Sequence, residues 1–90
     1  NIEVSIKAQG KLLKDGYGKF KYLLLRPVDI VEGRILAVAG RDELDLDDYH
    51  IEEKLGYSFA VPKTLAQLYK YLTIDYFPSV DEDAFKISLA

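Results

Sequence analysis

The dipeptide Asp15-Gly16 constrains this 90-residue chain most, because it stands between two apolar stretches. Both residues tolerate the positive φ angles that a tight two-residue turn requires. Upstream, apolar residues alternate with polar ones from Ile2 to Ala8, which is the period of a half-buried strand. Downstream, the run Tyr22–Leu25 is apolar on both faces, as is typical of a central strand. The pattern predicts a β-hairpin that turns at Asp15-Gly16.

The remainder of the chain predicts further strands and one or two helices. The segment Arg34–Ala39 is expected to form a buried third strand that ends at Gly40. Pro62 suits a first helical position, and the apolar spacing around it predicts a helix that begins there. Residues 43–55 and 79–89 carry both helix and strand signals. We expect a short helix over about residues 46–55 and a strand over about residues 84–89.

These elements predict an α+β fold in which one or two helices cover a small antiparallel meander sheet. Ninety residues suffice for one hydrophobic core, so residues 1–90 are expected to form a single domain. The start at Asn1 instead of Met suggests a domain cut from a longer protein. No apolar run approaches the ~18 residues of a membrane span, and no signal-peptide pattern opens the chain. We therefore expect a soluble, cytoplasmic protein that does not contact membranes.

The net charge of −3 hides an uneven distribution of charge. Residues 1–27 hold six basic and two acidic residues, a net charge of +4, whereas residues 41–53 hold one basic and seven acidic residues, a net charge of −6. The chain also has seven tyrosines, and exposed tyrosine often anchors protein interfaces. These features predict a non-catalytic interaction module that binds a basic protein or a second copy of itself. The expected binding residues are Asp45, Asp47, Asp48, Tyr49, Tyr71 and Tyr76.

The alternative prediction is a nucleic-acid-binding domain that uses the basic and aromatic segment 11–26. Basic side chains interleaved with aromatic ones on a strand can hold phosphates and stack bases. The segment resembles the Gly-aromatic-Gly-x-aromatic pattern of RNA-binding strands, but it carries an extra lysine and lies on the second strand. The negative net charge opposes a polyanionic ligand, so protein binding is preferred. The residues expected to bind nucleic acid are Lys14, Tyr17, Lys19, Phe20 and Lys21.

No motif indicates catalysis or a cofactor. The chain has no cysteine, which excludes disulfides and thiolate metal sites. His50 is the single histidine, and we expect it on the surface of an acidic helix because a metal site usually needs several ligands. The tripeptide Glu52-Glu53-Lys54 has the Glu-x-Lys spacing of metal-dependent nucleases, which also need an upstream aspartate on a paired strand. Asp42 or Asp45 could serve as that aspartate, but a spacing this short often occurs by chance. A metal-dependent hydrolase is therefore a distant third reading, and we predict a protein without enzymatic activity, metal or cofactor.

Overall fold

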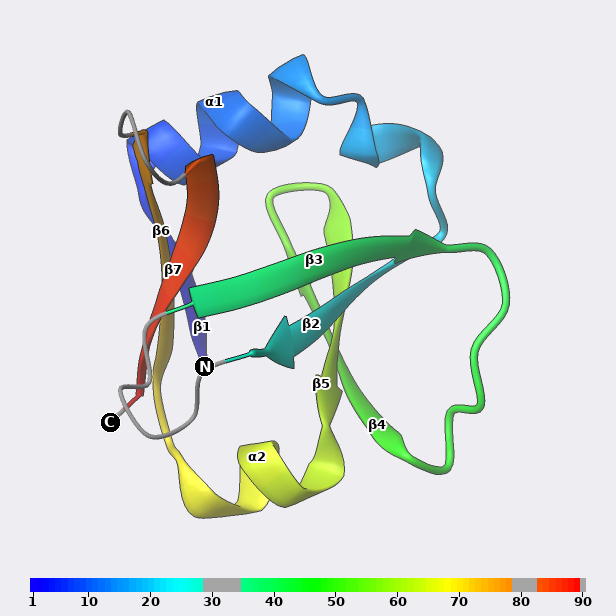
Figure 1. The fold of residues 1–90 in the computed structure, drawn as a ribbon. Helices are drawn as coiled ribbons and strands as arrows, with labels where there is room; N and C mark the ends of the chain where they lie inside the picture. The colour runs from blue at the N-terminus through cyan, green and yellow to red at the C-terminus, as the bar shows by residue number, and fades with distance from the viewer. Residues whose placement is uncertain (29–34, 79–82, 90) are drawn as a thin grey trace.

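The computed structural model describes residues 1–28, 35–78 and 83–89. Seven strands within these residues form one sheet in the order β1-β6-β7-β3-β2-β5-β4 (Figure 1). The pairs β1–β6 and β2–β5 are parallel, and the other neighbours are antiparallel. The elements are β1 (Ile2–Val4), α1 (Ile6–Lys14), the 3₁₀ turn η1 (Tyr17–Lys19), β2 (Tyr22–Pro27), β3 (Ile35–Arg41), β4 (Tyr49–Lys54), β5 (Tyr57–Pro62), α2 (Lys63–Leu68), β6 (Leu72–Pro78) and β7 (Asp83–Leu89).

The predicted small antiparallel meander covered by helices is wrong. The sheet is mixed and curls into a nearly closed barrel, and the two helices lie at its opposite ends and do not cover one face (Figure 1). The parallel pairs join segments that are far apart in the chain: Ile2 is opposite Leu72, and Leu23 is opposite Phe59. Local periodicity predicts which residues form a strand, but it does not predict which distant strand they pair with. The meander was predicted from the order of the strands in the sequence, and that order does not give the actual pairing.

The predicted hairpin at Asp15-Gly16 is wrong because a helix occupies the residues before it. The hydroxyl oxygen of Ser5 caps α1 by accepting a hydrogen bond from the N–H of Ala8 at 3.1 Å. After the helix, Gly16 has a φ of 74°, and its N–H donates to the carbonyl of Leu13 at 3.2 Å. The positive φ that the dipeptide predicts is therefore present, but it ends a helix and does not join two strands.

The strand predicted from Ile2 to Ala8 ends early for a related reason. Only Ile2–Val4 are extended, as β1, and the chain then turns into α1. Val4, Ala8 and Leu12 are buried and recur every four residues, so one apolar pattern serves the end of a strand and the inner face of a helix. The Ser5 hydroxyl also donates to Oδ1 of Asp75 in β6 at 2.6 Å, which ties the start of the helix to the sheet.

Three of the predicted strands are confirmed. The apolar run near Tyr22 forms β2, which lies between β3 and β5 and has three consecutive buried leucines. The third strand is confirmed as β3, but Leu36 is its one buried residue, and the strand continues through Gly40 to Arg41 instead of ending at Gly40. Its predicted first residue, Arg34, lies outside the described residues. The C-terminal strand is confirmed as β7. Residues 79–82, the beginning of the ambiguous stretch 79–89, lie outside the described residues.

The helix predicted over residues 46–55 is wrong, because this segment forms β4 and pairs antiparallel with β5. A two-residue turn at Leu55-Gly56 joins the two strands, and its φ angles are 57° and 83°. Two positive φ angles are typical of a type I′ turn. A tight hairpin therefore lies at Leu55-Gly56, and not at Asp15-Gly16 as predicted. The helix predicted at Pro62 is present as α2, but it begins one residue later, at Lys63, and ends at Leu68. Pro62 is its N-cap and the last residue of β5.

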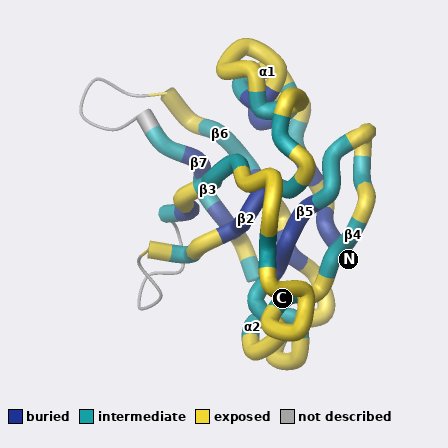
Figure 2. Tube along the Cα trace, turned by 90° about the vertical axis from the view of Figure 1, so that its right-hand side faces the viewer, coloured by how far each residue is buried: buried dark blue, intermediate teal, exposed yellow. Residues whose placement is uncertain are grey.

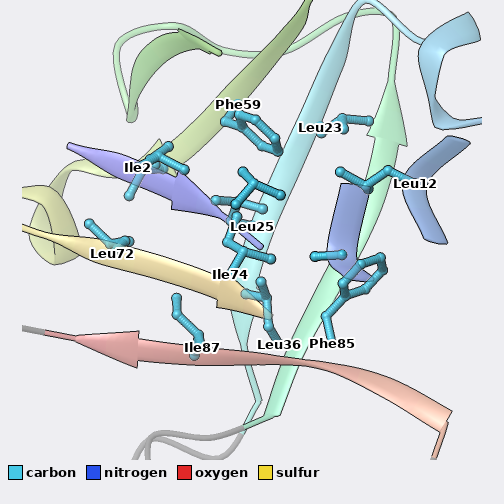
Figure 3. Close-up of a cluster of buried hydrophobic side chains, with 13 residues drawn as sticks. Ile2, Leu12, Leu23, Leu25, Leu36, Phe59, Leu72, Ile74, Phe85 and Ile87 are labelled. Carbon is cyan, nitrogen blue, oxygen red and sulfur yellow. The ribbon is translucent and has the colours of Figure 1, made fainter. Parts of the chain in front are cut away.

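The interior of the barrel holds one cluster of buried apolar side chains (Figure 3). Six strands contribute to it, and Ala8 and Leu12 of α1 close one end. None of the residues of the end strand β4 is buried. Figure 2 shows the same division, with burial concentrated in the central strands and exposure on both helices. Burial of one large side chain in such a core contributes about 1.5–3 kcal/mol. Within the described residues, no helix is long and apolar enough to cross a bilayer.

The ring of Phe20 lies directly over Gly40 of β3. A Cβ atom built on Gly40 would lie 2.0 Å from Cδ2 and 2.3 Å from Cγ of Phe20. These atoms are close to the Phe20 backbone, so the ring cannot easily move aside. We expect Gly40→Ala to lower the free energy of unfolding by about 1–3 kcal/mol through overpacking. Gly10→Ala is the control: its Cβ would meet nothing within 4 Å, and in a helix it should raise stability by about 0.5–1 kcal/mol. Equal effects in urea unfolding would contradict the packing.

Leu55 is the only non-glycine residue with positive φ among those described. The left-handed conformation costs an ordinary residue about 1–2 kcal/mol, and asparagine tolerates it better. Leu55 is 52% exposed, so its replacement removes little buried area. We expect Leu55→Asn to raise the free energy of unfolding by about 1 kcal/mol, measured by thermal and urea denaturation. Leu68→Asn, at an exposed residue of α2, should give no gain.

Candidate functional site

The end strands of the sheet, β1 and β4, are joined by side chains. Oε2 of Glu52 in β4 accepts a hydrogen bond from the N–H of Ile2 in β1 at 2.6 Å. Two residues further along β4, on the same face of the strand, Nζ of Lys54 lies 3.8 Å from Oε1 of Glu3. The Glu52 side chain is 23% exposed, whereas the Lys54–Glu3 pair is open to solvent and is worth little. The hydrogen bond to the Glu52 carboxylate is therefore the stronger of the two contacts that close the barrel.

Beside this closure lies a cavity of about 470 Å³ between β1, β4, β5 and α2. Its floor is apolar and consists of Ile2, Val61 and Leu72, which are buried. The volume is within the range of small-molecule sites. The polar residues around it are Asn1, His50, Glu52, Lys63, Gln67, Tyr69 and Lys70.

The rim of this cavity is weighted toward positive charge. Lys63 and Lys70 are exposed, and no carboxylate of the described residues forms an ion pair with either. The one acidic side chain of the lining, Glu52, is engaged with the backbone of β1. An apolar floor beneath two ammonium groups can accommodate a small molecule with an apolar body and an anionic group.

The Glu-x-Lys spacing noted in the sequence has a structural explanation. Residues two apart on a strand face the same side, so Glu52 and Lys54 both point toward β1. Their partners are a backbone N–H and Glu3, and the two residues close the barrel. The sequence did not single out the lysines of the cavity rim, because an exposed lysine at the start of a helix or in the bend after it carries no pattern that marks a cavity.

The six residues predicted to bind protein do not share one surface. Tyr76 of β6 packs at the α1 end of the barrel, where its ring centroid lies 5.7 Å from that of Phe85 and 5.3 Å from Nζ of Lys11. Tyr71 is exposed between α2 and β6, at the opposite end (Figure 1). The other four lie in the connection between β3 and β4 or at the start of β4, namely Asp45, Asp47, Asp48 and Tyr49.

The five residues predicted to bind nucleic acid do not line a strand. The aromatic rings among them are used inside the fold: Tyr17 donates its hydroxyl hydrogen to the carbonyl of Val38 at 3.2 Å, and the Phe20 ring covers Gly40. The set is spread over the end of α1, the turn η1 and the bend before β2, as Lys14, Tyr17, Lys19, Phe20 and Lys21. This arrangement offers no row of rings on which bases could stack.

Comparison with known proteins gives no match by sequence and a match by structure. A scan against models of protein families finds no match, and a search of curated proteins finds none. A crystal structure of IscA with the [2Fe-2S] cluster has a TM-score of 0.64 and 18% identity, over 99% of this chain and 85% of that one. Escherichia coli SufA, involved in biosynthesis of iron-sulfur clusters, has a TM-score of 0.67 and 14% identity, over the same shares. This chain has the fold of IscA and SufA.

This fold overturns both functions predicted from the sequence. One structural neighbour holds a [2Fe-2S] cluster and the other is involved in biosynthesis of iron-sulfur clusters, and neither is a general interaction module with an acidic, tyrosine-rich surface. They are also unlike the sheet-type single-strand binders on which the nucleic-acid prediction rested. The prediction relied on charge asymmetry and on aromatic content, and the aromatic residues are largely explained by packing.

The residues of this chain do not fit a [2Fe–2S] cluster. Such clusters are held by four cysteine thiolates, or by two cysteines and two histidines in Rieske centres. The chain has no cysteine, and its single histidine, His50, is exposed on β4. In the parts of the chain that the structure describes, no three His, Asp or Glu residues are placed to hold a metal ion. The IscA/SufA fold is present here without the cysteine ligands of such a cluster.

The closure by Glu52 can be tested with a neighbouring glutamate as the control. Glu52→Ala leaves the N–H of Ile2 without its acceptor, and we expect a loss of about 1–3 kcal/mol in the free energy of unfolding. Glu53→Ala removes an exposed carboxylate from the next position and should change stability by less than about 0.5 kcal/mol. Amide hydrogen exchange should also become faster at Ile2 in the first variant only. Equal stabilities would show that the barrel does not depend on this bond.

Proposed function

We propose that this chain serves iron–sulfur cluster biogenesis with the fold of a cluster-associated protein, but without ligating a cluster itself. The single observation that carries the proposal is the likeness to IscA and SufA, which extends over 99% of this chain. The absence of cysteine supports the second half of the proposal, because thiolates are the ligands that these clusters require.

The proposed role is non-catalytic and cytoplasmic, and it is exerted on another protein. Proteins that share a fold present related surfaces, so a chain without ligands can pair with one that holds a cluster. We expect this chain to bind a cluster-loaded protein of the same fold and to change the rate at which that protein releases its cluster. Recognition would then come from the shared barrel, while the cluster chemistry stays entirely on the partner.

The experiment uses E. coli SufA loaded with a [2Fe–2S] cluster under anaerobic conditions. The release of its cluster to an apo-ferredoxin is followed by visible circular dichroism, with and without a molar excess of this chain. We expect a severalfold change in the transfer rate. An unrelated domain of equal size and net charge is the control for non-specific effects, and an unchanged rate would overturn the accessory role.

The non-ligating half of the proposal has a separate test. The chain alone, incubated with ferrous iron, sulfide and a thiol reductant and then desalted, should show no sulfide-to-iron absorption and no bound iron. Bound iron and sulfide in equal amounts would overturn this half, whatever the result of the transfer experiment. The two outcomes are therefore distinguishable.

A further inference from the structure

The outer face of α1 carries an apolar stripe. Ile6 is 87% exposed and Leu13 is 76% exposed, although both are large aliphatic residues. At 100° per residue these side chains and Gly10 fall on one side of the helix, opposite the buried pair Ala8 and Leu12. Ala8 and Leu12 on the inner face make the contacts of α1 with the core, so the stripe adds little buried apolar area to the fold. An exposed apolar stripe of this kind needs another explanation.

The stripe forms one wall of an open groove. The other wall is the turn between β4 and β5, and the groove has a volume of about 390 Å³. Gly10 lies at the centre of the stripe, and a Cβ at this position would meet nothing within 4 Å. A partner backbone can therefore approach the helix closely between Ile6 and Leu13. The remaining lining residues are Gln9, Leu55 and Tyr57, of which Leu55 is 52% exposed.

The border of the groove is basic. Residues 6–14 contain three lysines and no acidic residue. By helical geometry, Lys7 and Lys14 lie along the edge of the stripe that is away from the turn. Nζ of Lys7 lies 5.7 Å from the ring centroid of Phe77, which is itself half exposed. The surface therefore fits a segment that combines acidic side chains with an aliphatic one.

The chain itself contains such a segment. Residues 42–48, between β3 and β4, hold five acidic residues interrupted by Leu44 and Leu46. The N–H of Asp47 donates to Oδ1 of Asp45 at 3.1 Å, and the N–H of Asp48 donates to the carbonyl of the same residue at 3.2 Å. This compact turn has Leu46 at its tip, where the side chain is 50% exposed.

The acidic segment of a chain cannot reach the groove of the same chain. Its start is tied to the bend before β2, because the N–H of Lys21 donates to Oδ1 of Asp42 at 3.2 Å. Its end is tied to the α2 end of the barrel, because the N–H of Lys63 donates to the carbonyl of Asp48 at 3.1 Å. The helix α1 lies at the other end (Figure 1). Any contact between the two surfaces must therefore join two copies.

We propose that the groove on α1 binds the acidic segment 42–48 of a second copy of this chain. Leu46 of one copy packs between Ile6 and Leu13 of the other, and the neighbouring carboxylates lie beside Lys7 and Lys14. Each copy offers one groove and one segment, and we propose the reciprocal arrangement, in which two copies related by a two-fold axis use both contacts. The pairing is a property of this chain alone and does not depend on the role in cluster biogenesis.

The association is measured by sedimentation velocity over a range of protein concentrations, at low and at moderate ionic strength. We expect a reversible monomer–dimer equilibrium that weakens with salt, because exposed charge pairs are screened. Leu13→Ser and Leu46→Ser should each raise the dissociation constant roughly tenfold or more. Leu68→Ser, at a leucine of α2 that is 74% exposed, is the matched control and should leave the dissociation constant unchanged.

A charge exchange tests the geometry of the contact. Lys14→Glu in one copy and Asp47→Lys in another should each weaken self-association, and a mixture of the two variants should form a heterodimer. All of these residues are exposed, so the variants are expected to fold, which amide NMR spectra can verify. A chain that stays monomeric at every concentration, or a Leu68→Ser variant that dissociates like Leu13→Ser, would overturn the proposal. So would variants that fail to pair with each other.

Discussion

The hydrogen bond from the N–H of Ile2 to the carboxylate of Glu52 holds the two end strands of this barrel together. A curled sheet that does not close leaves two edges with unpaired backbone groups, and such edges invite pairing with other chains. Here the edge of β1 is short and one of its N–H groups is satisfied by a side chain of β4. The closure is linked to the core through Ile2. Its backbone N–H donates the hydrogen bond, and its side chain lies buried among the interior side chains (Figure 3).

The sequence predicted the elements that are buried on both faces and failed where one pattern fits two structures. The three leucines of β2 have no alternative to a central strand, so this element was predicted correctly. A residue with positive φ suits a hairpin turn as well as the end of a helix, and at Gly16 the helix prevails because Ser5 caps it and Leu12 is buried. The strand β4 gains its extended conformation from pairing with β5, and no local pattern in its sequence predicts that pairing.

The candidate site was less predictable than the fold, because β1 and β4 are the two ends of the sheet and come together only when it curls into a barrel. The sequence did mark Glu52 and Lys54 by their Glu-x-Lys spacing, and the structure explains that spacing because both side chains contact β1. Aromatic content, by contrast, was misleading. Tyr17, Phe20, Tyr76 and Phe85 pack on one another, so they report a core and not a surface for ligands.

A barrel of this kind separates the fold from the chemistry that a fold can carry. Ligands for a cluster are side chains on the outside of a stable scaffold, and they can be absent without loss of the core. In this chain the packing of Phe59 and Leu25 is complete, and the contacts that close the sheet need no metal. The exposed Ile6 and Leu13 of α1 and the acidic turn after β3 are then the features for which a physical role has to be found.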